Sequence, residues 1–298
     1  MPDRPAFTAD FPTPEPLRFS PNSFLTIVGE GWGDPTASPV VLLHGGGQTR
    51  HSWGDTARRI AQRGWYAVAL DARGHGESSW SPDGRYQVED LVDDLKGVVA
   101  QLAARPALVG ASLGGITALL AEGESTVPFG AALVLVDTAP RVEQKGIERI
   151  FAFMNQHAAG FADLEEAAAA VAAYLPHRPR PADGRRLEKN LRRATDGRYY
   201  WHWDPRMLKS WQDTDPNHQL RNTERMFAAA RRLAVPTLIV RGGVSDVVSE
   251  RVVSEFLEAV PHARSADVSG AGHTVAGDSN HAFTNAVIDF LSDAYPAR

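Results

Sequence analysis

Short, uninterrupted apolar runs are the feature that most restricts how this chain can fold. They are rich in Val, Leu and Ala, and each ends close to Gly, Asp or His: 39–46 (PVVLLHGG), 66–71 (YAVALD), 107–110 (ALVG), 131–137 (AALVLVD) and 236–243 (PTLIVRGG). Continuous rather than alternating hydrophobicity is typical of strands that are buried on both faces, as in a parallel sheet. The runs therefore predict strands of such a sheet.

Segments with helical periodicity lie between these runs. In 87–104 (QVEDLVDDLKGVVAQLAA), apolar residues such as Leu91 and Leu95 recur at spacings of three and four and form one stripe. The alternation of strands and helices predicts an α/β fold with a doubly wound, mostly parallel sheet. Ligands bind beyond the carboxyl ends of such strands, which is where Gly, His, Asp and Ser gather in this chain.

The alternation stops at residue 138. From about residue 139 to residue 233 only helical patterns are found. We interpret this segment as a helical cap that is inserted between two strands and covers the site, with an unrelated second domain as the alternative. The predicted organisation is a Pro-rich arm over 1–20, an α/β core over 21–138 and 234–298, and a cap over 139–233.

Composition and charge exclude several classes of function. The formal net charge is −5 and there is no block of Lys and Arg, so nucleic acid is not an expected partner. The chain has no cysteine, which excludes disulfides, thiolate metal sites and a cysteine nucleophile. No export signal is apparent and no stretch reaches the ~18 apolar residues needed to span a bilayer. We expect a cytoplasmic protein without a membrane partner, metal or cofactor; the oligomeric state is left open.

The segment 108–115 (LVGASLGG) contains the pattern G-x-S-x-G between a predicted strand and a predicted helix. So sharp a turn forces Ser112 into an unfavourable backbone conformation and leaves no room for side chains at Gly110 and Gly114. It also exposes the Ser112 hydroxyl and places the N–H of Leu113 at the start of a helix, where it can face a developing oxyanion. We interpret Ser112 as a nucleophile; a plain structural turn is the alternative.

With these patterns the chain resembles the α/β-hydrolase superfamily from about Leu17 to Leu291, and within it capped serine hydrolases of the epoxide-hydrolase, haloperoxidase and meta-cleavage-hydrolase type. The segments 42–53 (LLHGGGQTRHSW) and 70–79 (LDARGHGESS) match motifs of this superfamily. The resemblance implies that Gly46 is the second oxyanion donor beside Leu113, although which glycine of 45–47 donates stays open. A glycine turn without this role is the alternative.

The polar side chains of these two segments are interpreted as structural. We expect Asp71, Arg73 and His75 to brace a loop and His44 to be a structural hydrogen-bonding group rather than a catalytic base.

His273 is the candidate general base. It lies in the glycine-rich segment 269–277 (SGAGHTVAG), and a base that must reach the serine hydroxyl needs a loop at the carboxyl end of the sheet. Two residues are candidates for the acid that orients it. Asp246, in GGVSD, has the form more usual in the superfamily and is preferred, and Asp137, at the end of the run 131–137, is the alternative.

The cap contributes an aromatic segment, 197–205 (GRYYWHWDP). We regard Tyr199, Tyr200, Trp201 and Trp203 as candidates for pocket lining, with plain packing as the alternative. Epoxide hydrolases attack with an aspartate at the position of Ser112, which argues against epoxide opening.

The predicted function is a cofactor-independent serine hydrolase that cleaves a small-molecule carboxylic ester or lactone through an acyl-enzyme. A carbon–carbon bond hydrolase and a perhydrolase of the haloperoxidase kind are alternatives, because pocket shape sets the chemistry of one triad. A non-catalytic ligand receptor is the alternative from a different class.

Overall fold

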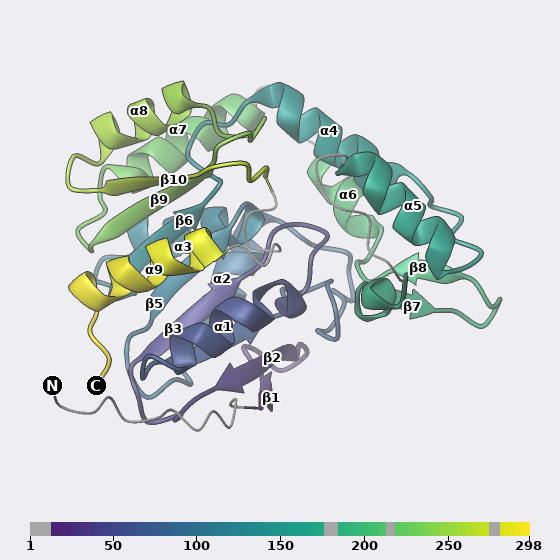
Figure 1. The fold of residues 1–298 in the computed structure, drawn as a ribbon, viewed down its shortest axis with the longest axis horizontal. Coiled ribbons are helices and arrows are strands. Elements are labelled where there is room, and N and C mark those ends of the chain that lie inside the picture. The colour runs from purple at the N-terminus through teal and green to yellow at the C-terminus, as the bar shows by residue number, and fades with distance from the viewer. Residues whose placement is uncertain (1–12, 176–183, 213–217, 274–280) are drawn as a thin grey trace, which may run out of the picture.

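An eight-stranded sheet of order β1-β2-β4-β3-β5-β6-β9-β10 forms the centre of the molecule (Figure 1). The computed structural model describes residues 13–175, 184–212, 218–273 and 281–298. The strands are β1 (Glu15–Phe19), β2 (Ile27–Trp32), β3 (Pro39–Leu43), β4 (Tyr66–Leu70), β5 (Ala107–Ala111), β6 (Ala132–Val136), β9 (Thr237–Gly242) and β10 (Arg264–Val268). Strand β2 is antiparallel to both neighbours and the remaining pairs are parallel. The predicted α/β fold with a mostly parallel sheet is confirmed.

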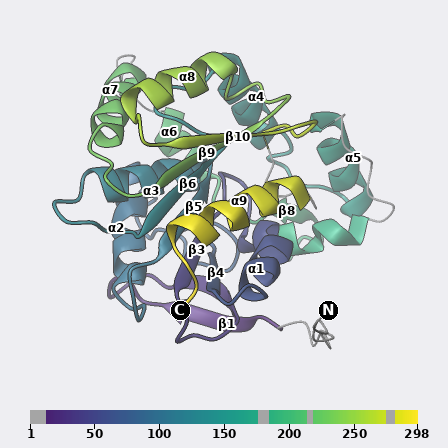
Figure 2. The ribbon, with the colours of Figure 1, turned by 60° about the vertical axis from the view of Figure 1, so that its left-hand side comes forward.

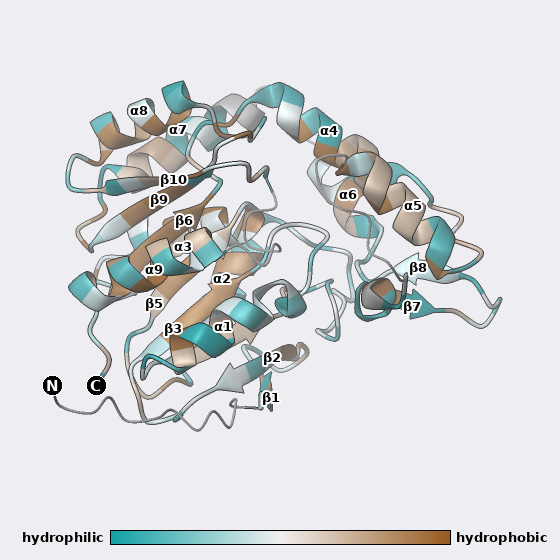
Figure 3. Cartoon of the chain, in the orientation of Figure 1, coloured by the Kyte–Doolittle hydropathy of each residue, from teal (hydrophilic) through white to brown (hydrophobic). Residues whose placement is uncertain are grey.

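The five apolar runs form the strands β3, β4, β5, β6 and β9. Every residue of β4, β5 and β6 is buried, which explains why their hydrophobicity is continuous. Figure 3 shows these strands as the hydrophobic interior of the molecule.

Helices cover both faces of this sheet (Figures 1 and 2). Apolar residues of α1 and α9 form one core with one face, and those of α2, α3, α7 and α8 form a second core with the other. These helices are α1 (Gly54–Ala61), α2 (Val88–Val99), α3 (Leu113–Gly123), α7 (His218–Ala230), α8 (Glu250–Ala259) and α9 (His281–Ala294). The predicted stripe of α2 is buried against the sheet through Leu91 and Leu95.

Most of the segment between β6 and β9 extends beyond the sheet, on the right in Figure 1. The elements of this part are α4 (Gln144–Asn155), α5 (Leu164–Tyr174), a 3-10 helix (Gly184–Asn190), β7 (Leu191–Arg193), β8 (Tyr199–Trp201) and α6 (Arg206–Gln212). We call them the cap. The backbone N–H of Glu143 donates to the carbonyl of Val247 (2.8 Å), and that of Asp204 donates to the carbonyl of Gly74 (2.8 Å), so two points of the cap are fixed to core loops.

The expectation for residues 139–233 needs two corrections. First, the segment is not purely helical, because β7 and β8 pair as a small antiparallel sheet. Second, α7 is part of the helical layer on the sheet. It packs so tightly on α3 that a Cβ at Gly123 would lie 2.4 Å from the carbonyl oxygen of Ala229.

The expected arm over 1–20 is also corrected, because Glu15–Phe19 form the edge strand β1; residues 1–12 lie outside the described residues. Over the described ranges, no helix has the length and apolar character to cross a membrane.

Candidate active site

Ser112 is the single residue between the end of β5 at Ala111 and the start of α3 at Leu113. Its φ of 48° and ψ of −115° show the strained backbone that the sequence predicts for this turn. Two glycines permit it: a Cβ at Gly110 would lie 2.4 Å from the carbonyl oxygen of Gly114, and a Cβ at Gly114 would lie 2.4 Å from that of Leu43. The turn therefore presents a half-buried serine directly before a helix N-terminus.

The glycine loop after β3 lies beside this serine, because a Cβ at Gly45 would be 3.2 Å from the Cβ of Ser112. Two of its three N–H groups are engaged: Gly45 donates to Oε1 of Gln48 (3.2 Å) and Gly47 donates to Nε2 of His75 (3.0 Å). Within the described part of the chain, the N–H of Gly46 makes no hydrogen bond, and neither does that of Leu113. Gly46 is thus the glycine of 45–47 whose N–H is available to a ligand.

His273 is paired with Asp137. Its Nδ1 lies 2.7 Å from Oδ2 of Asp137, whose side chain is completely buried, while the side chain of His273 is 8% exposed. The carboxylate also accepts hydrogen bonds from the N–H of Gly242 (2.9 Å) and the hydroxyl of Ser245 (2.6 Å). These contacts fix the carboxylate, and the carboxylate in turn fixes the orientation of the imidazole.

Asp246, the acid that the sequence favours, is bound elsewhere. Its carboxylate forms an ion pair with Arg149 of α4, at 2.7 Å between Oδ2 and Nε and 3.0 Å between Oδ1 and Nη2. The guanidinium of Arg149 also lies over the ring of Tyr174, 4.9 Å from its centroid. The preference for Asp246 is therefore corrected: the structure places Asp137, the alternative, on His273, because α4 brings a cation to Asp246.

Two buried histidines support the glycine loop. Nδ1 of His44 donates to the carbonyl of Gly45 (2.8 Å), and its Nε2 accepts from the N–H of Ala72 (3.0 Å). Nδ1 of His75 lies 3.1 Å from the carbonyl of Arg73, and its Nε2 accepts from Gly47. This pattern requires neutral rings, and burial lowers the pKa of His44 and lowers that of His75 to about 3. Both are structural hydrogen-bonding groups, as expected.

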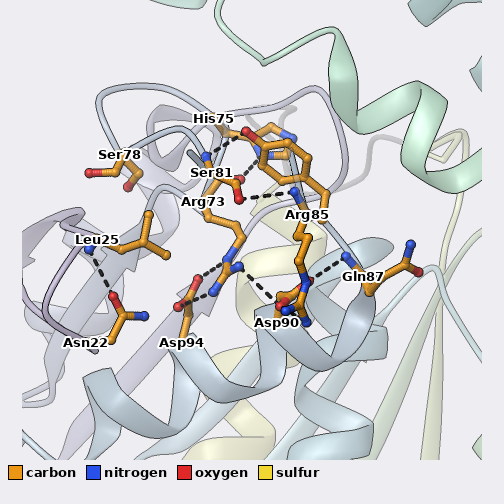
Figure 4. A network of polar contacts seen from close by, with 12 residues as sticks. Asn22, Leu25, Arg73, His75, Ser78, Ser81, Arg85, Gln87, Asp90 and Asp94 are labelled. Atoms are coloured by element: carbon orange, nitrogen blue, oxygen red, sulfur yellow. Dashed lines mark hydrogen bonds and ion pairs between the residues drawn. The ribbon is translucent and has the colours of Figure 1, made fainter. Parts of the chain in front are cut away.

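The loop after β4 is held by buried ion pairs, some of which Figure 4 shows. Arg73 binds both carboxylate oxygens of Asp94 on α2 (2.5 and 2.7 Å). Asp71 accepts from the N–H of Arg50 (2.7 Å) and also binds its guanidinium. The bracing role expected for Asp71 and Arg73 is observed.

The four predicted aromatic residues differ in position. Trp203 packs on the glycine loop, since a Cβ at Gly47 would be 3.3 Å from its ring, and Trp201 stacks on Trp203 at 4.9 Å between centroids. Tyr199 pairs with Phe161, and Tyr200 donates its hydroxyl to the exposed Asp196, so both are bound within the cap.

Sequence reasoning missed Trp211 of α6, whose ring would lie 3.4 Å from a Cβ at Gly46. A single tryptophan in a helical segment gave no signal. Among the described residues, no group of three or more His, Asp or Glu side chains is arranged to hold a metal ion.

Comparison with known proteins shows the family to which a chain with this arrangement belongs. Residues 40–286, which run from the second residue of β3 into α9, match the sequence profile of the alpha/beta hydrolase family. The chain belongs to the alpha/beta hydrolase family. Within it, the esterase Rv0045c of Mycobacterium tuberculosis is 31% identical over 86% of this chain and 83% of its own. A crystal structure of that esterase has a TM-score of 0.74 and covers 94% of this chain and 93% of its own, at 29% identity.

Two further similar proteins carry the names of other hydrolases. The 3-hydroxybutyrate-oligomer hydrolase of Cupriavidus necator is 26% identical over 85% of this α/β hydrolase and 89% of its own chain. The crystal structure of E-2-(acetamidomethylene)succinate hydrolase has a TM-score of 0.81 at 24% identity, covering 94% of this chain and 100% of its own, which supports the fold. The names of the relatives, esterases and hydrolases, support an enzyme with hydrolase activity.

Proposed function

We propose that this α/β hydrolase is a serine hydrolase that cleaves small-molecule carboxylic esters or lactones through an acyl-enzyme, with Ser112, His273 and Asp137 as its triad. The observation that carries the proposal is the 2.7 Å hydrogen bond between the buried Asp137 and His273. Ser112, Asp137 and His273 follow β5, β6 and β10, whose carboxyl ends share one edge of the sheet because these strands are parallel to their neighbours. Asp246, bound to Arg149, has no part in this triad.

His273 would act as the general base. Because its Nδ1–H donates to Asp137, Nε2 carries the free lone pair and can accept the proton of the Ser112 hydroxyl. As that proton leaves, Oγ attacks the carbonyl carbon of the ester. The negative charge of Asp137 stabilises the imidazolium that forms.

The N–H groups of Gly46 and Leu113 would bind the oxyanion of the tetrahedral intermediate. Both are without an acceptor in the described part of the chain, and Leu113 begins α3, whose N-terminal dipole favours negative charge. A donor of this kind contributes about 3–4 kcal/mol to transition-state stabilisation.

Collapse of the intermediate breaks the bond between the carbonyl carbon and the leaving oxygen. His273 donates its proton to that oxygen, and the alcohol departs or, in a lactone, stays attached to the acyl group. His273 then removes a proton from water, which attacks the carbonyl carbon of the acyl-enzyme. When the bond between that carbon and Oγ breaks, His273 returns the proton to Ser112 and the acid is released.

The test is covalent labelling with a fluorophosphonate, read out by intact mass. The wild-type protein is expected to gain one adduct and Ser112→Ala none. Ser254→Ala, which removes an exposed hydroxyl on α8, is the matched control and should be labelled like the wild type.

Turnover is measured on p-nitrophenyl esters of increasing acyl length and on lactones. Labelling of Ser112 with turnover on this panel supports the proposal. An unlabelled wild-type protein would indicate a receptor, and labelling without turnover on any ester or lactone would favour carbon–carbon hydrolysis.

A further inference from the structure

The indole of Trp211 lies beside Gly46, one of the two proposed oxyanion donors. A methyl group at Gly46 would be 3.4 Å from Cη2 of Trp211 and 4.0 Å from Cδ2 of Leu113. An oxyanion bound to these N–H groups lies about 3 Å from them, and its carbonyl carbon is one bond further. Substituents on that carbon therefore come close to the edge of the indole.

The indole is held in place by the core. Its Nε1–H donates to the carbonyl of Tyr86 at 2.8 Å, and the ring packs edge-to-face on Phe151 of α4, with centroids 6.2 Å apart. In the same helix, Nε2 of Gln87 donates to the carbonyl (3.2 Å) and the hydroxyl (3.0 Å) of Ser210. Rotation of the ring would leave a partly buried N–H without its acceptor, so the indole is a fixed wall.

The loop after β4 anchors α6 a second time, through Asp204. The fully buried Tyr86 donates its hydroxyl to Asp204 (2.6 Å), and Arg206 binds the same carboxylate (2.6 Å) and the carbonyl of Ser81 (2.9 Å). Burial and the hydrogen bond to Asp204 raise the pKa of Tyr86, which keeps the hydroxyl protonated as a donor. Trp211 is thus placed by the core rather than by the cap alone.

The described side chains that pack on the neighbouring glycine are apolar. On the neighbouring glycine, a Cβ at Gly47 would be 3.2 Å from Cε of Met154 and 3.3 Å from the ring of Trp203. The wall beside the glycine loop is therefore formed by apolar side chains.

The geometry points to Trp211 as the specificity-determining residue of the proposed esterase: its indole closes the acyl subsite beside Gly46 and restricts it to short, unbranched acyl groups. The inference rests on the proposed function and adds to it the class of acyl group. Because the wall stands beside the carbonyl carbon, its main effect is on branching at the first carbon of the acyl chain.

The test compares kcat/KM for p-nitrophenyl acetate and p-nitrophenyl isobutyrate, which share one leaving group. Trp211→Leu and Trp211→Met open the wall, while Trp211→Phe retains an aromatic ring. Phe153→Leu is the matched control, because it removes a cap aromatic that stacks on Tyr174, 4.1 Å between centroids. Thermal unfolding verifies that each variant is folded.

We expect the ratio of isobutyrate to acetate turnover to rise about 10-fold or more in the two opening variants, since isobutyryl carries two methyl groups more than acetyl and a single methyl group in an apolar pocket already changes kcat/KM by ~10–200-fold. Phe153→Leu should stay within about 3-fold of the wild type. Trp211→Phe lacks the Cη2 and Cζ3 atoms that face Gly46, so its ratio should rise by less than that of the opening variants but in the same direction.

An unchanged ratio in both folded opening variants that still hydrolyse the acetate would overturn the role of Trp211. A shift seen only when the alcohol of an acetate ester is varied would overturn the assignment to the acyl side. If the wild-type protein is neither labelled at Ser112 nor active on the acetate, the proposed function itself is wrong. This result differs from the two results that would overturn only the role of Trp211.

Discussion

Backbone strain is concentrated at the proposed active site. Three non-glycine residues of the described chain have a positive φ, and two of them are Ser112 and Asp137, both at 48°. Such a conformation costs about 1–3 kcal/mol and persists only where the surroundings enforce it. The N–H of Ser112 donates to the carbonyl of Val136 (3.1 Å) and that of Asp137 to the carbonyl of Val240 (2.7 Å). The sheet itself therefore holds the proposed nucleophile and the proposed acid in place.

His75 should make folding stability depend on pH. Its pKa is 6.5 in an exposed chain and about 3 in the folded protein, because burial opposes its charge. The unfolded state thus binds the proton more strongly. The contribution of the neutral His75 to the free energy of unfolding is complete above pH 6.5 and is lost as the pH falls from 6.5 towards 3. At pH 5 the free energy of unfolding is lower by about 2 kcal/mol. The buried His44 acts in the same direction.

Urea unfolding at pH 7.5 and pH 5 tests this. The free energy of unfolding of the wild type should fall between the two, and His75→Gln should show a smaller fall, by ~2 kcal/mol. His262→Gln, at an exposed histidine, should behave like the wild type. An equally steep fall in His75→Gln would contradict a buried, neutral His75.

At the scale of elements, the close packing of the turn between β5 and α3 requires glycine at positions where a side chain would clash. Gly110→Ala would place a Cβ 2.4 Å from the carbonyl oxygen of Gly114, which belongs to backbone and has little freedom to move. We expect a loss of about 2 kcal/mol or more in the free energy of unfolding. Gly54→Ala is the matched control, because a Cβ there meets nothing within 4 Å at the start of α1.

The control should be neutral or stabilising by up to about 1 kcal/mol, since alanine has the higher helix propensity. Urea denaturation of both variants measures the difference. Equal free energies of unfolding for Gly110→Ala and Gly54→Ala would show that the turn tolerates a side chain, which would contradict its close packing.

Hydrophobic pattern predicts elements that are buried on both faces better than those at an edge. Strands β3 to β6 and β9 are recognisable because each contains an unbroken series of apolar residues. Strand β2 is not recognised in this way because two glycines interrupt its apolar residues. Its packing requires a glycine at position 31, since a Cβ at Gly31 would lie 2.5 Å from the hydroxyl of Tyr66. Strand β1 lies in a segment whose prolines suggested an arm.

At the scale of the whole molecule, the proposed triad depends on which strand end faces His273. Asp137 follows β6 and Asp246 follows β9, and these strands are neighbours in the sheet. Local sequence is compatible with either acid. Which acid pairs with His273 depends on the position of α4. Arg149 of α4 forms an ion pair with Asp246, while the hydroxyl of Ser245 donates to Asp137. Such a long-range arrangement has no signature in either segment.

The position of Trp211 also depends on contacts between distant segments, which no local sequence pattern indicates. Ser112, Leu113, Gly46 and His273 could be selected from sequence because each lies in a glycine-rich turn at a strand end. Trp211 comes close to Gly46 only because Tyr86 and Gln87, more than one hundred residues earlier, hold α6.

One matched pair of variants tests the proposed triad most directly. Replacement of a triad acid by the neutral amide is expected to lower kcat by about 10⁴-fold, because the imidazole loses its orientation and its counter-charge. Asp246→Asn removes only an ion pair that is more than a third exposed on both sides, worth under ~1 kcal/mol.

The measurement is kcat/KM for p-nitrophenyl acetate in Asp137→Asn and Asp246→Asn, both verified to be folded. We predict a loss of about 10³–10⁴-fold for Asp137→Asn and a change within about 3-fold for Asp246→Asn. A large loss in Asp246→Asn together with near-normal activity in Asp137→Asn would contradict the triad proposed for this protein.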